Sequence, residues 1–494
     1  MEVLRTSQPI SWLDDLGADG TVIHPGHELF GKNLAGCELH LPGSSGSTVG
    51  SDRIVNLAVH GHAPRRIVLG RVDPITMWGA ILGGIDVEVE GAPRKEVDRA
   101  KIERLGIDPE IADLLARAGE ILGTDEFIPA DHVQIAGVSY KTITEAGLEL
   151  RRHFASRFRF RSRNVTINPA GMDLEDWREQ GIPGEFAEKQ REVIEIYLRM
   201  GATPTVTCTP YLIGSMPAPF TDAFLSESSV VSYANSVLGV RTNRESGLST
   251  LLFAIAGYGP RYGLHHRENR APRLGVRVRC ELRGVVDFGL LGYRLGEIAR
   301  GRIPYLTGIR DRPTTEELKV LSAAGAASGS IDLYHIEGVT PEERSGLVPL
   351  SDIEEWVDID RSSLDEVKRH LNTGSVAEVD LVTFGCPHAS LEEVHEIASL
   401  LRGKKVRRGV AVWVCTSRAV KDLARRMGYV DLIETAGGHV VADTCMVVAP
   451  IEQMGHRTTA TNSGKAAKYL PRFCQQKVVF DSAEEIIRKI VATT

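Results

Sequence analysis

A loop near the amino end of the chain concentrates residue types that could place a serine hydroxyl in an activated position. The segment LPGSSGSTVGSDRI spans residues 41–54 and holds three glycines and four serines within residues 43–51. Glycines let backbone N–H groups approach an anion at the start of a helix. The loop has neither the Gly-Lys-Ser/Thr of a P-loop nor the glycine spacing of a dinucleotide fingerprint. Two interpretations stay open, a flexible turn that caps a helix, or a serine alkoxide that is stabilised there and acts as a base on carbon.

Four of the seven cysteines lie in similar local contexts. These are TVTCTPY, VTFGCPHAS, VWVCTSR and ADTCMVV, which contain Cys208, Cys386, Cys415 and Cys445. Three of them close an apolar strand-like run, and ligands gather at that end of the strands in open α/β sheets. Thiolates from separate strands can hold an iron–sulfur cluster. Because the chain has no CxxC motif, the alternative of four small buried hydrophobic residues stays open.

Five further segments combine Gly, Ser, Asn and Pro with neighbouring apolar runs, a composition typical of loops that carry function. They are residues 135–143, 165–173, 208–214, 225–245 and 461–470. Each could be an ordinary turn, but five in one chain predict that some meet at a pocket. Lys465, in the last segment, could bind a carboxylate or be a solvated lysine at a helix start. The chain has no HExxH and no GxSxG motif, which disfavours a zinc hydrolase and an α/β-hydrolase.

The elements that must position these residues follow an alternating strand and helix pattern. Residues 20–90 form a unit of alternating strand-like and helix-like segments, which predicts a small and largely parallel α/β domain. A charged helical connector follows at 95–123. Residues 124–494 predict a larger α/β region, with clear strand-then-helix units at 376–401, 408–430 and 443–452.

The length, the net charge and the longest apolar stretches of the chain limit the classes of protein to which it can belong. The 494 residues are too many for one core, so two to four domains are expected. A formal charge of −7 disfavours a nucleic-acid binder. The start of the chain lacks signal-peptide features, and apolar stretches such as 248–257 are too short to span a bilayer. We therefore expect a cytoplasmic protein that binds neither membrane nor nucleic acid, with unpaired cysteines.

Taken together, these segments resemble the aconitase X family over nearly the whole chain. LAGCELHLPGSSGSTVGS and RVDPITMWGAILGGIDVEV are similar to the family's small swivel part. GVSYKTI, NPAGMDLEDW, IPGEFAEKQ, TCTPYLIG, RTNRESG, FGCPHAS and DTCMVV are similar to its large catalytic part. The resemblance implies an α/β fold with a swivel domain at 1–94, the connector at 95–123, and a catalytic region of several α/β subdomains at 124–494.

The resemblance also implies roles for individual residues. Ser47 is the implied proton acceptor, and Cys208, Cys386 and Cys445 are the implied ligands of an iron–sulfur cluster of the [2Fe-2S] type. Cys415 has no counterpart in the family motif. The implied substrate contacts are Gly137, Val138, Ser139, Asn168, Pro169, Glu227, Ser228 and Lys465.

Enzymes of this kind remove water from a hydroxy acid. Within the family, the presence of the small and the large part in one chain favours cis-3-hydroxy-L-proline as the substrate, which is dehydrated toward 1-pyrroline-2-carboxylate. The alternatives are 5-phosphomevalonate as the substrate, a non-catalytic iron–sulfur protein that senses redox state or iron, and a metal-free binding protein. We expect a small-molecule substrate as the partner and a monomer.

Overall fold

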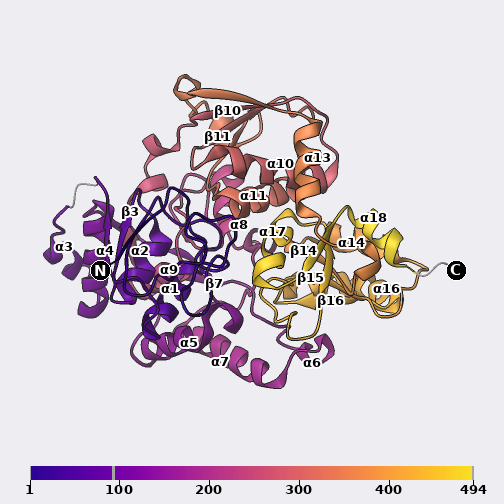
Figure 1. Ribbon diagram of the computed structural model, residues 1–494, viewed down its shortest axis with the longest axis horizontal. Helices are drawn as coiled ribbons and strands as arrows, with labels where there is room; N and C mark the ends of the chain where they lie inside the picture. The colour runs from indigo at the N-terminus through magenta and orange to yellow at the C-terminus, as the bar shows by residue number, and fades with distance from the viewer. Residues whose placement is uncertain (1, 92–94, 492–494) are drawn as a thin grey trace.

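The expected α/β fold is confirmed in a computed structural model, which describes residues 2–91 and 95–491. Figure 1 shows the amino-terminal part in indigo at the left, residues 270–370 in orange at the top, and the carboxyl-terminal part in yellow at the right. The predicted domain boundary between residues 94 and 95 falls beside residues 92–94, which lie outside the described ranges. The first residue of the predicted swivel domain, 1, and the last residue of the predicted catalytic region, 494, also lie outside these ranges.

The amino-terminal part is built on a four-stranded parallel sheet in the order β1-β2-β3-β4. The predicted alternation is confirmed, and β1 adds an edge strand that was not predicted. The helix α2 starts at Pro74, where the fixed φ of proline suits the first helical position. The elements are β1 (Val3–Arg5), β2 (Glu38–Leu41), α1 (Gly50–Val59), β3 (Arg66–Leu69), α2 (Pro74–Leu82) and β4 (Asp86–Val89).

The second part contains two helices followed by the three-stranded parallel sheet β7-β6-β8 and the antiparallel pair β5-β9. Its helices and strands are α3 (Arg99–Glu103), α4 (Pro109–Leu122), β5 (Phe127–Pro129), β6 (His132–Ile135), α5 (Tyr140–Arg157), β7 (Asn164–Ile167), α6 (Trp177–Gln180), α7 (Gly184–Met200), β8 (Phe224–Leu225), α8 (Ser228–Tyr233), α9 (Gly247–Ala256) and β9 (Tyr258–Pro260). Short turns of helix are η1 (Pro210–Ile213), η2 (Ala234–Leu238), η3 (Gly263–His265) and η4 (Arg267–Arg270).

The third part carries the parallel sheet β12-β11-β10-β13. Its helices α10 and α11 approach closely because glycines face each other; a Cβ on Gly296 would lie 1.9 Å from Ser328 Oγ. The elements are β10 (Leu274–Val278), α10 (Gly284–Ala299), β11 (Pro304–Thr307), α11 (Thr315–Gly329), β12 (His335–Ile336), α12 (Pro341–Arg344), η5 (Leu350–Asp352), β13 (Glu355–Ile359) and α13 (Arg361–Leu371).

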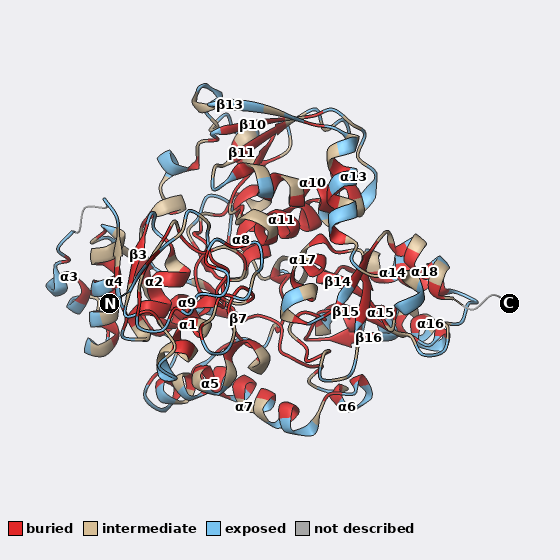
Figure 2. Cartoon of the chain, in the orientation of Figure 1, coloured by how far each residue is buried: buried red, intermediate tan, exposed pale blue. Residues whose placement is uncertain are grey.

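The fourth part carries the five-stranded parallel sheet β16-β15-β14-β17-β18, covered by helices on both faces. Its strand β14 is buried along its whole length, as Figure 2 shows for the inner strands of the sheets. The elements are η6 (Val376–Glu378), β14 (Leu381–Ala389), α14 (Leu391–Leu401), β15 (Ala411–Thr416), α15 (Arg418–Arg426), α16 (Tyr429–Ala436), β16 (His439–Ala442), β17 (Thr458–Thr461), α17 (Gly464–Phe473), β18 (Lys477–Phe480) and α18 (Ala483–Ile490).

The strand-then-helix units at 376–401 and 408–430 are confirmed, but the one predicted at 443–452 is wrong. Its strand ends before this segment, at Ala442, and Asp443 has a positive φ of 64° that breaks the extended conformation. The N–H groups of Val448 and Ala449 then donate to the carbonyl of Cys445 and close a compact turn. The apolar side chains of this segment are buried in a loop, and a buried loop has the same apolar composition as a buried strand, which explains the wrong prediction.

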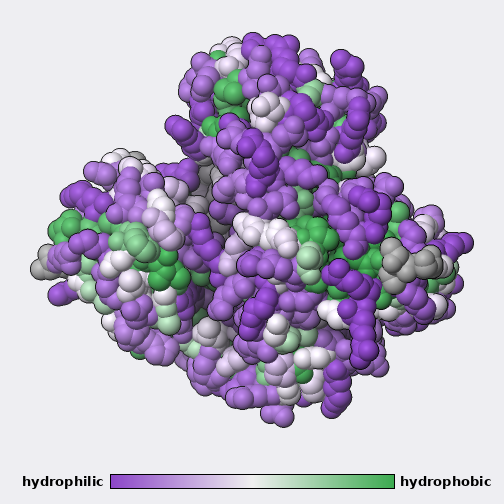
Figure 3. Space-filling view, turned by 45° about the vertical axis from the view of Figure 1, so that its right-hand side comes forward, coloured by the Kyte–Doolittle hydropathy of each residue, from purple (hydrophilic) through white to green (hydrophobic). Residues whose placement is uncertain are grey.

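The outer surface carries no large apolar face in the view of Figure 3, where hydrophobic residues form separate patches among hydrophilic ones. Within residues 2–91 and 95–491, none of the helices combines the length and the apolar character needed to cross a membrane.

Candidate active site

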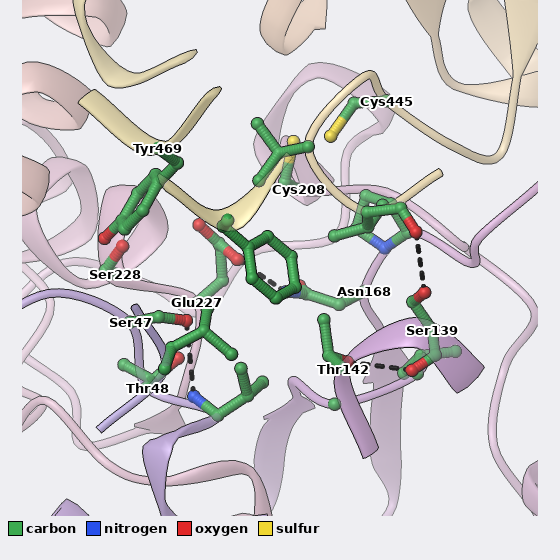
Figure 4. Close-up of a pocket in the computed structure, with 18 of the residues that line it drawn as sticks. Ser47, Thr48, Ser139, Thr142, Asn168, Cys208, Glu227, Ser228, Cys445 and Tyr469 are labelled. Carbon is green, nitrogen blue, oxygen red and sulfur yellow. Dashed lines mark hydrogen bonds between the residues drawn. The ribbon is translucent and has the colours of Figure 1, made fainter. Parts of the chain in front are cut away.

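One cavity, with a volume of about 70 Å³, brings together all twelve residues that the resemblance implied. It is lined by residues of all five polar segments and of the serine loop (Figure 4). The implied residues among them are Ser47, Gly137, Val138, Ser139, Asn168, Pro169, Cys208, Glu227, Ser228, Cys386, Cys445 and Lys465. Residues that follow the parallel strands β6 and β7 of one sheet, and residues at the carboxyl end of β14 of another parallel sheet, line the same cavity.

The serine loop is held by hydrogen bonds to the amino-terminal part and to the second part of the chain. Ser44 donates two hydrogen bonds to the Asp73 carboxylate, from its N–H at 2.7 Å and from its hydroxyl at 2.9 Å. Gly46 takes a positive φ of 77°, and its carbonyl accepts a hydrogen bond from Arg244 of the second part. Ser47 lies just before α1, and its Oγ accepts from the N–H of Val49 at 3.5 Å. The amino end of α1 therefore supplies positive potential near this hydroxyl.

A second loop, Gly137–Ser139, joins β6 to the start of α5. Gly137 has a φ of 75°, and its carbonyl accepts from Arg151 at 3.1 Å. The carbonyl of Val138 accepts from Gln190 at 2.8 Å, and the hydroxyl of Ser139 donates to the carbonyl of Val448 at 2.8 Å. No hydrogen bond in the described part of the chain uses the N–H of Val138 or of Ser139. These two donors remain available at the cavity wall.

The charged pair of the cavity is Glu227 and Lys465. The ammonium of Lys465 contacts Glu227 Oε1, and Asn168 donates to Glu227 Oε2 at 2.5 Å. Burial alone would raise the pKa of Glu227, but Lys465 and these hydrogen bonds hold it below its ordinary value. The pKa of Lys465 is raised: burial would lower it, and the opposing charge of Glu227 outweighs that effect. Both side chains are therefore ionised at neutral pH.

The three cysteine side chains on the cavity wall are 5–6% exposed. A hydrogen bond from the Cys386 thiol lowers the pKa of Cys445 to about 7, and the N–H groups of Val448 and Val447 contribute to this shift. The same hydrogen bond and burial raise the pKa of Cys386. Burial, followed by the charge of Glu227, raises the pKa of Cys208 to about 12. In the view of Figure 4, the Glu227 side chain lies between Ser47 and the sulfurs of Cys208 and Cys445.

The donor set suits an iron–sulfur cluster. Three thiols, one of them held close to ionisation, meet at one cavity with backbone N–H groups directed at Cys208 and Cys445. Among the described residues, no group of three or more His, Cys, Asp or Glu side chains is arranged to hold a metal ion.

The fourth candidate cysteine, Cys415, is fully buried on β15 and does not line the cavity. Sequence reasoning missed Thr142 and Tyr469, although both lie in segments that it singled out. The Tyr469 hydroxyl is buried without a hydrogen-bond partner among the described residues. Thr48 and Val49 of the serine loop and Val447 and Val448 of the Cys445 segment were missed in the same way. Leu13 and Phe473 also line the cavity, and they lie outside the segments that the sequence singled out.

Comparisons with known proteins agree with this architecture. Four family models match, the Aconitase X swivel domain at 2–104, the first domain at 107–268, the second domain at 272–369 and the third domain at 379–492. The crystal structure of Thermococcus kodakaraensis aconitase X (holo-form) is similar, with a TM-score of 0.71 and 41% identity, over 77% of this chain and 95% of that chain.

Two named relatives extend the comparison. The phosphomevalonate dehydratase large subunit of Methanothermobacter thermautotrophicus is 45% identical over 76% of this chain and 92% of its own length. The cis-3-hydroxy-L-proline dehydratase of Pseudomonas aeruginosa is 30% identical over 93% of this chain and 88% of its own length. With these relatives and the four matching models, the chain belongs to the aconitase X family and is a dehydratase of that family.

Proposed function

We propose that this dehydratase acts on cis-3-hydroxy-L-proline and yields 1-pyrroline-2-carboxylate, with Ser47 as the base. The observation that carries the proposal is the shared cavity, where a serine at a helix start faces a buried carboxylate–ammonium pair and three thiols. The substrate is a β-hydroxy acid, so its α-proton and its β-hydroxyl must leave from adjacent carbons.

The chain's own residues supply the proton transfer and the charge stabilisation. Ser47 reacts as its alkoxide, which the N–H of Val49 and the amino end of α1 stabilise, and it becomes a neutral hydroxyl when it takes the α-proton. The unused N–H groups of Val138 and Ser139 can donate to the substrate carboxylate as its negative charge grows. Water forms from the β-hydroxyl and one proton, and the enamine product tautomerises to the cyclic imine.

The cofactor in this proposal is an iron–sulfur cluster bound by Cys208, Cys386 and Cys445, with the [2Fe-2S] form as our prediction. When bound, it supplies a Lewis acid that polarises the leaving hydroxyl. The ratio of iron to acid-labile sulfide and the visible absorption of anaerobically purified protein test this assignment.

The charge of the cavity supports an amino acid as the substrate. Among the described lining residues, Lys465 is the one permanent cation and Glu227 the one permanent anion. Cis-3-hydroxy-L-proline is a zwitterion whose carboxylate and ring ammonium match one cation and one anion. Its α-hydrogen and hydroxyl lie on opposite ring faces, which suits a base on one side of the cavity and the thiols on another.

A second candidate substrate is 5-phosphomevalonate. The observation that favours it is the 45% identity to a phosphomevalonate dehydratase large subunit, higher than the 30% identity to the hydroxyproline enzyme. This compound carries a phosphate in addition to a carboxylate, so it needs more cations than Lys465. A second cavity has Arg71 and Arg244 among its lining residues and could supply such cations.

One anaerobic assay separates the candidates. The protein, with its iron content measured, is given each compound in turn, and the cyclic imine or the dehydrated phosphate ester is followed. Turnover of cis-3-hydroxy-L-proline with none of 5-phosphomevalonate supports the proposal, and the reverse result replaces it with the second candidate. An iron-loaded sample that is inert toward both would favour a non-catalytic iron–sulfur sensor. We also propose that the protein is a monomer.

A further inference from the structure

A buried histidine, His388, follows Cys386 by two residues and contacts the segments that carry Cys208 and Cys445. It does not line the cavity. Its side chain is fully buried. Nδ1 lies 2.9 Å from the hydroxyl of Thr207, and Nε2 lies 3.0 Å from the carbonyl of Thr444. Its backbone N–H donates to Cys208 Sγ at 3.3 Å.

The partners of His388 are the immediate neighbours of the cysteines in sequence. Thr207 precedes Cys208, Thr444 precedes Cys445, and His388 itself follows Cys386 by two residues. One imidazole ring therefore connects two segments whose residues Thr207 and Thr444 are 181 and 56 positions away from His388 in the sequence.

We propose that His388 is a positioning residue that fixes the spacing of Cys208, Cys386 and Cys445 before any cofactor binds. The inference rests on the proposed function in taking these three cysteines as the ligand set. His388 is not itself a ligand in this proposal, because both ring nitrogens face protein groups.

The hydrogen-bonding partners define one state of the ring. A carbonyl can only accept, so Nε2 carries the hydrogen that is donated to Thr444. In the neutral ring Nδ1 then accepts from the Thr207 hydroxyl, whose oxygen accepts in turn from the N–H of Thr209 at 3.1 Å. The ammonium of Lys319 donates to the His388 carbonyl at 3.1 Å and holds the backbone. Turning the ring would leave buried polar atoms without partners.

Variants that remove one hydrogen bond of the His388 ring at a time can separate a role in positioning the cysteines from a role in the stability of the whole protein. Thr207→Val removes the Nδ1 tether and leaves His388 in place. His388→Gln can keep a donor near Thr444, and His388→Asn can keep a partner near Thr207. The control is His335→Asn, since His335 is also buried and donates from Nε2 to a backbone carbonyl at 2.9 Å, but in the third part of the chain.

The readout is the alkylation rate of each cysteine in the folded iron-free protein, mapped by mass spectrometry, together with the melting temperature. We expect Thr207→Val and His388→Gln to speed alkylation of Cys208 at least about tenfold, and His388→Asn to do so for Cys445. His335→Asn should leave these rates unchanged even if it lowers the melting temperature. Re-addition of iron and sulfide should then give less than half of the wild-type cluster absorbance in the Thr207 and His388 variants.

Unchanged alkylation rates in folded Thr207→Val and His388→Gln proteins would overturn the proposal, as would wild-type cluster content in both. Because alkylation needs no cofactor, the test is separate from the proposed function. Segment-specific alkylation in a protein that never binds iron would support the positioning role and reject the cluster.

Discussion

Asp52 of α1 and Arg151 of α5 form a fully buried ion pair, with Arg151 Nη1 2.7 Å from Asp52 Oδ1. The same guanidinium donates to the carbonyl of Gly137 and to the hydroxyl of Tyr197. Asp52 lies five residues after Ser47. The pair therefore couples the serine loop of the swivel part to the Gly137–Ser139 loop of the catalytic part.

Removal of one charge from this pair should be costly. In Asp52→Asn the Arg151 charge stays buried without a counter-charge, and we expect the free energy of unfolding to fall by roughly 3–5 kcal/mol. Chemical denaturation measures this change. The control is Asp113→Asn, which breaks the exposed pair with Arg99 at 2.9 Å and should cost less than about 1 kcal/mol. Equal effects of the two substitutions would contradict the coupling.

The Lys465–Glu227 pair allows binding and stability to be separated. Lys465→Met leaves Glu227 buried without its cation, so both the melting temperature and kcat/KM should fall, the latter at least about 100-fold. The double variant Lys465→Met/Glu227→Gln removes both charges and should recover most of the melting temperature but not the activity. Recovery of both would show that the pair has only a structural role.

The cysteines should differ sharply in their effect on iron. Cys445→Ser removes a cavity-lining thiol and should abolish the visible absorption and most of the bound iron in anaerobically purified protein. Cys415→Ala changes a buried thiol that does not line the cavity and should keep both. Iron loss in Cys415→Ala with a retained melting temperature would mean that the ligand set is wrong.

Glu245 should make stability depend on pH. Burial raises its pKa from 4.5 to about 7, against hydrogen bonds from Tyr262 at 2.6 Å and Ser249 at 2.9 Å. Since the folded pKa is above the unfolded one, the stabilisation is full below pH 4.5 and is lost as the pH rises through 7. This loss can reach about 3 kcal/mol.

The variant Glu245→Gln stays neutral, so it should gain stability relative to the wild type between pH 5 and 8. Melting temperatures across this range provide the measurement. The exposed residue Glu195 provides the control Glu195→Gln, which should follow the wild-type profile. A Glu245→Gln profile parallel to that of the wild type would contradict the raised pKa.

Much of the site could be predicted because its residue types are concentrated in short segments. The serine loop and the polar segments each combine glycine with hydroxyl or amide side chains, and these features are local in sequence. The contacts that hold the segments together could not be predicted in this way. Asp52 and Arg151 are 99 residues apart, and His388 reaches Thr207 across 181 residues. Such pairs depend on how the parts pack.

In the Cys445 segment, too, the sequence pattern did not predict the backbone conformation. Its apolar composition predicts a strand, yet Asp443 turns the chain, and its carboxylate pairs with Arg418 at the start of the preceding helix α15. Tyr469 was missed for a related reason. An aromatic residue four positions after Lys465 is typical of a helix core, and only the packing of α17 brings its hydroxyl to the cavity.

The central claim is that Ser47 is the base, and one comparison tests it most directly. Ser47→Ala and Ser45→Ala are measured with cis-3-hydroxy-L-proline at matched iron content and matched melting temperature. Loss of a general base costs about 10²–10⁴-fold in rate, so we predict a fall of that size in Ser47→Ala and nearly full activity in Ser45→Ala. An iron-loaded Ser47→Ala protein that retains its rate within a few-fold of the wild type would contradict the account.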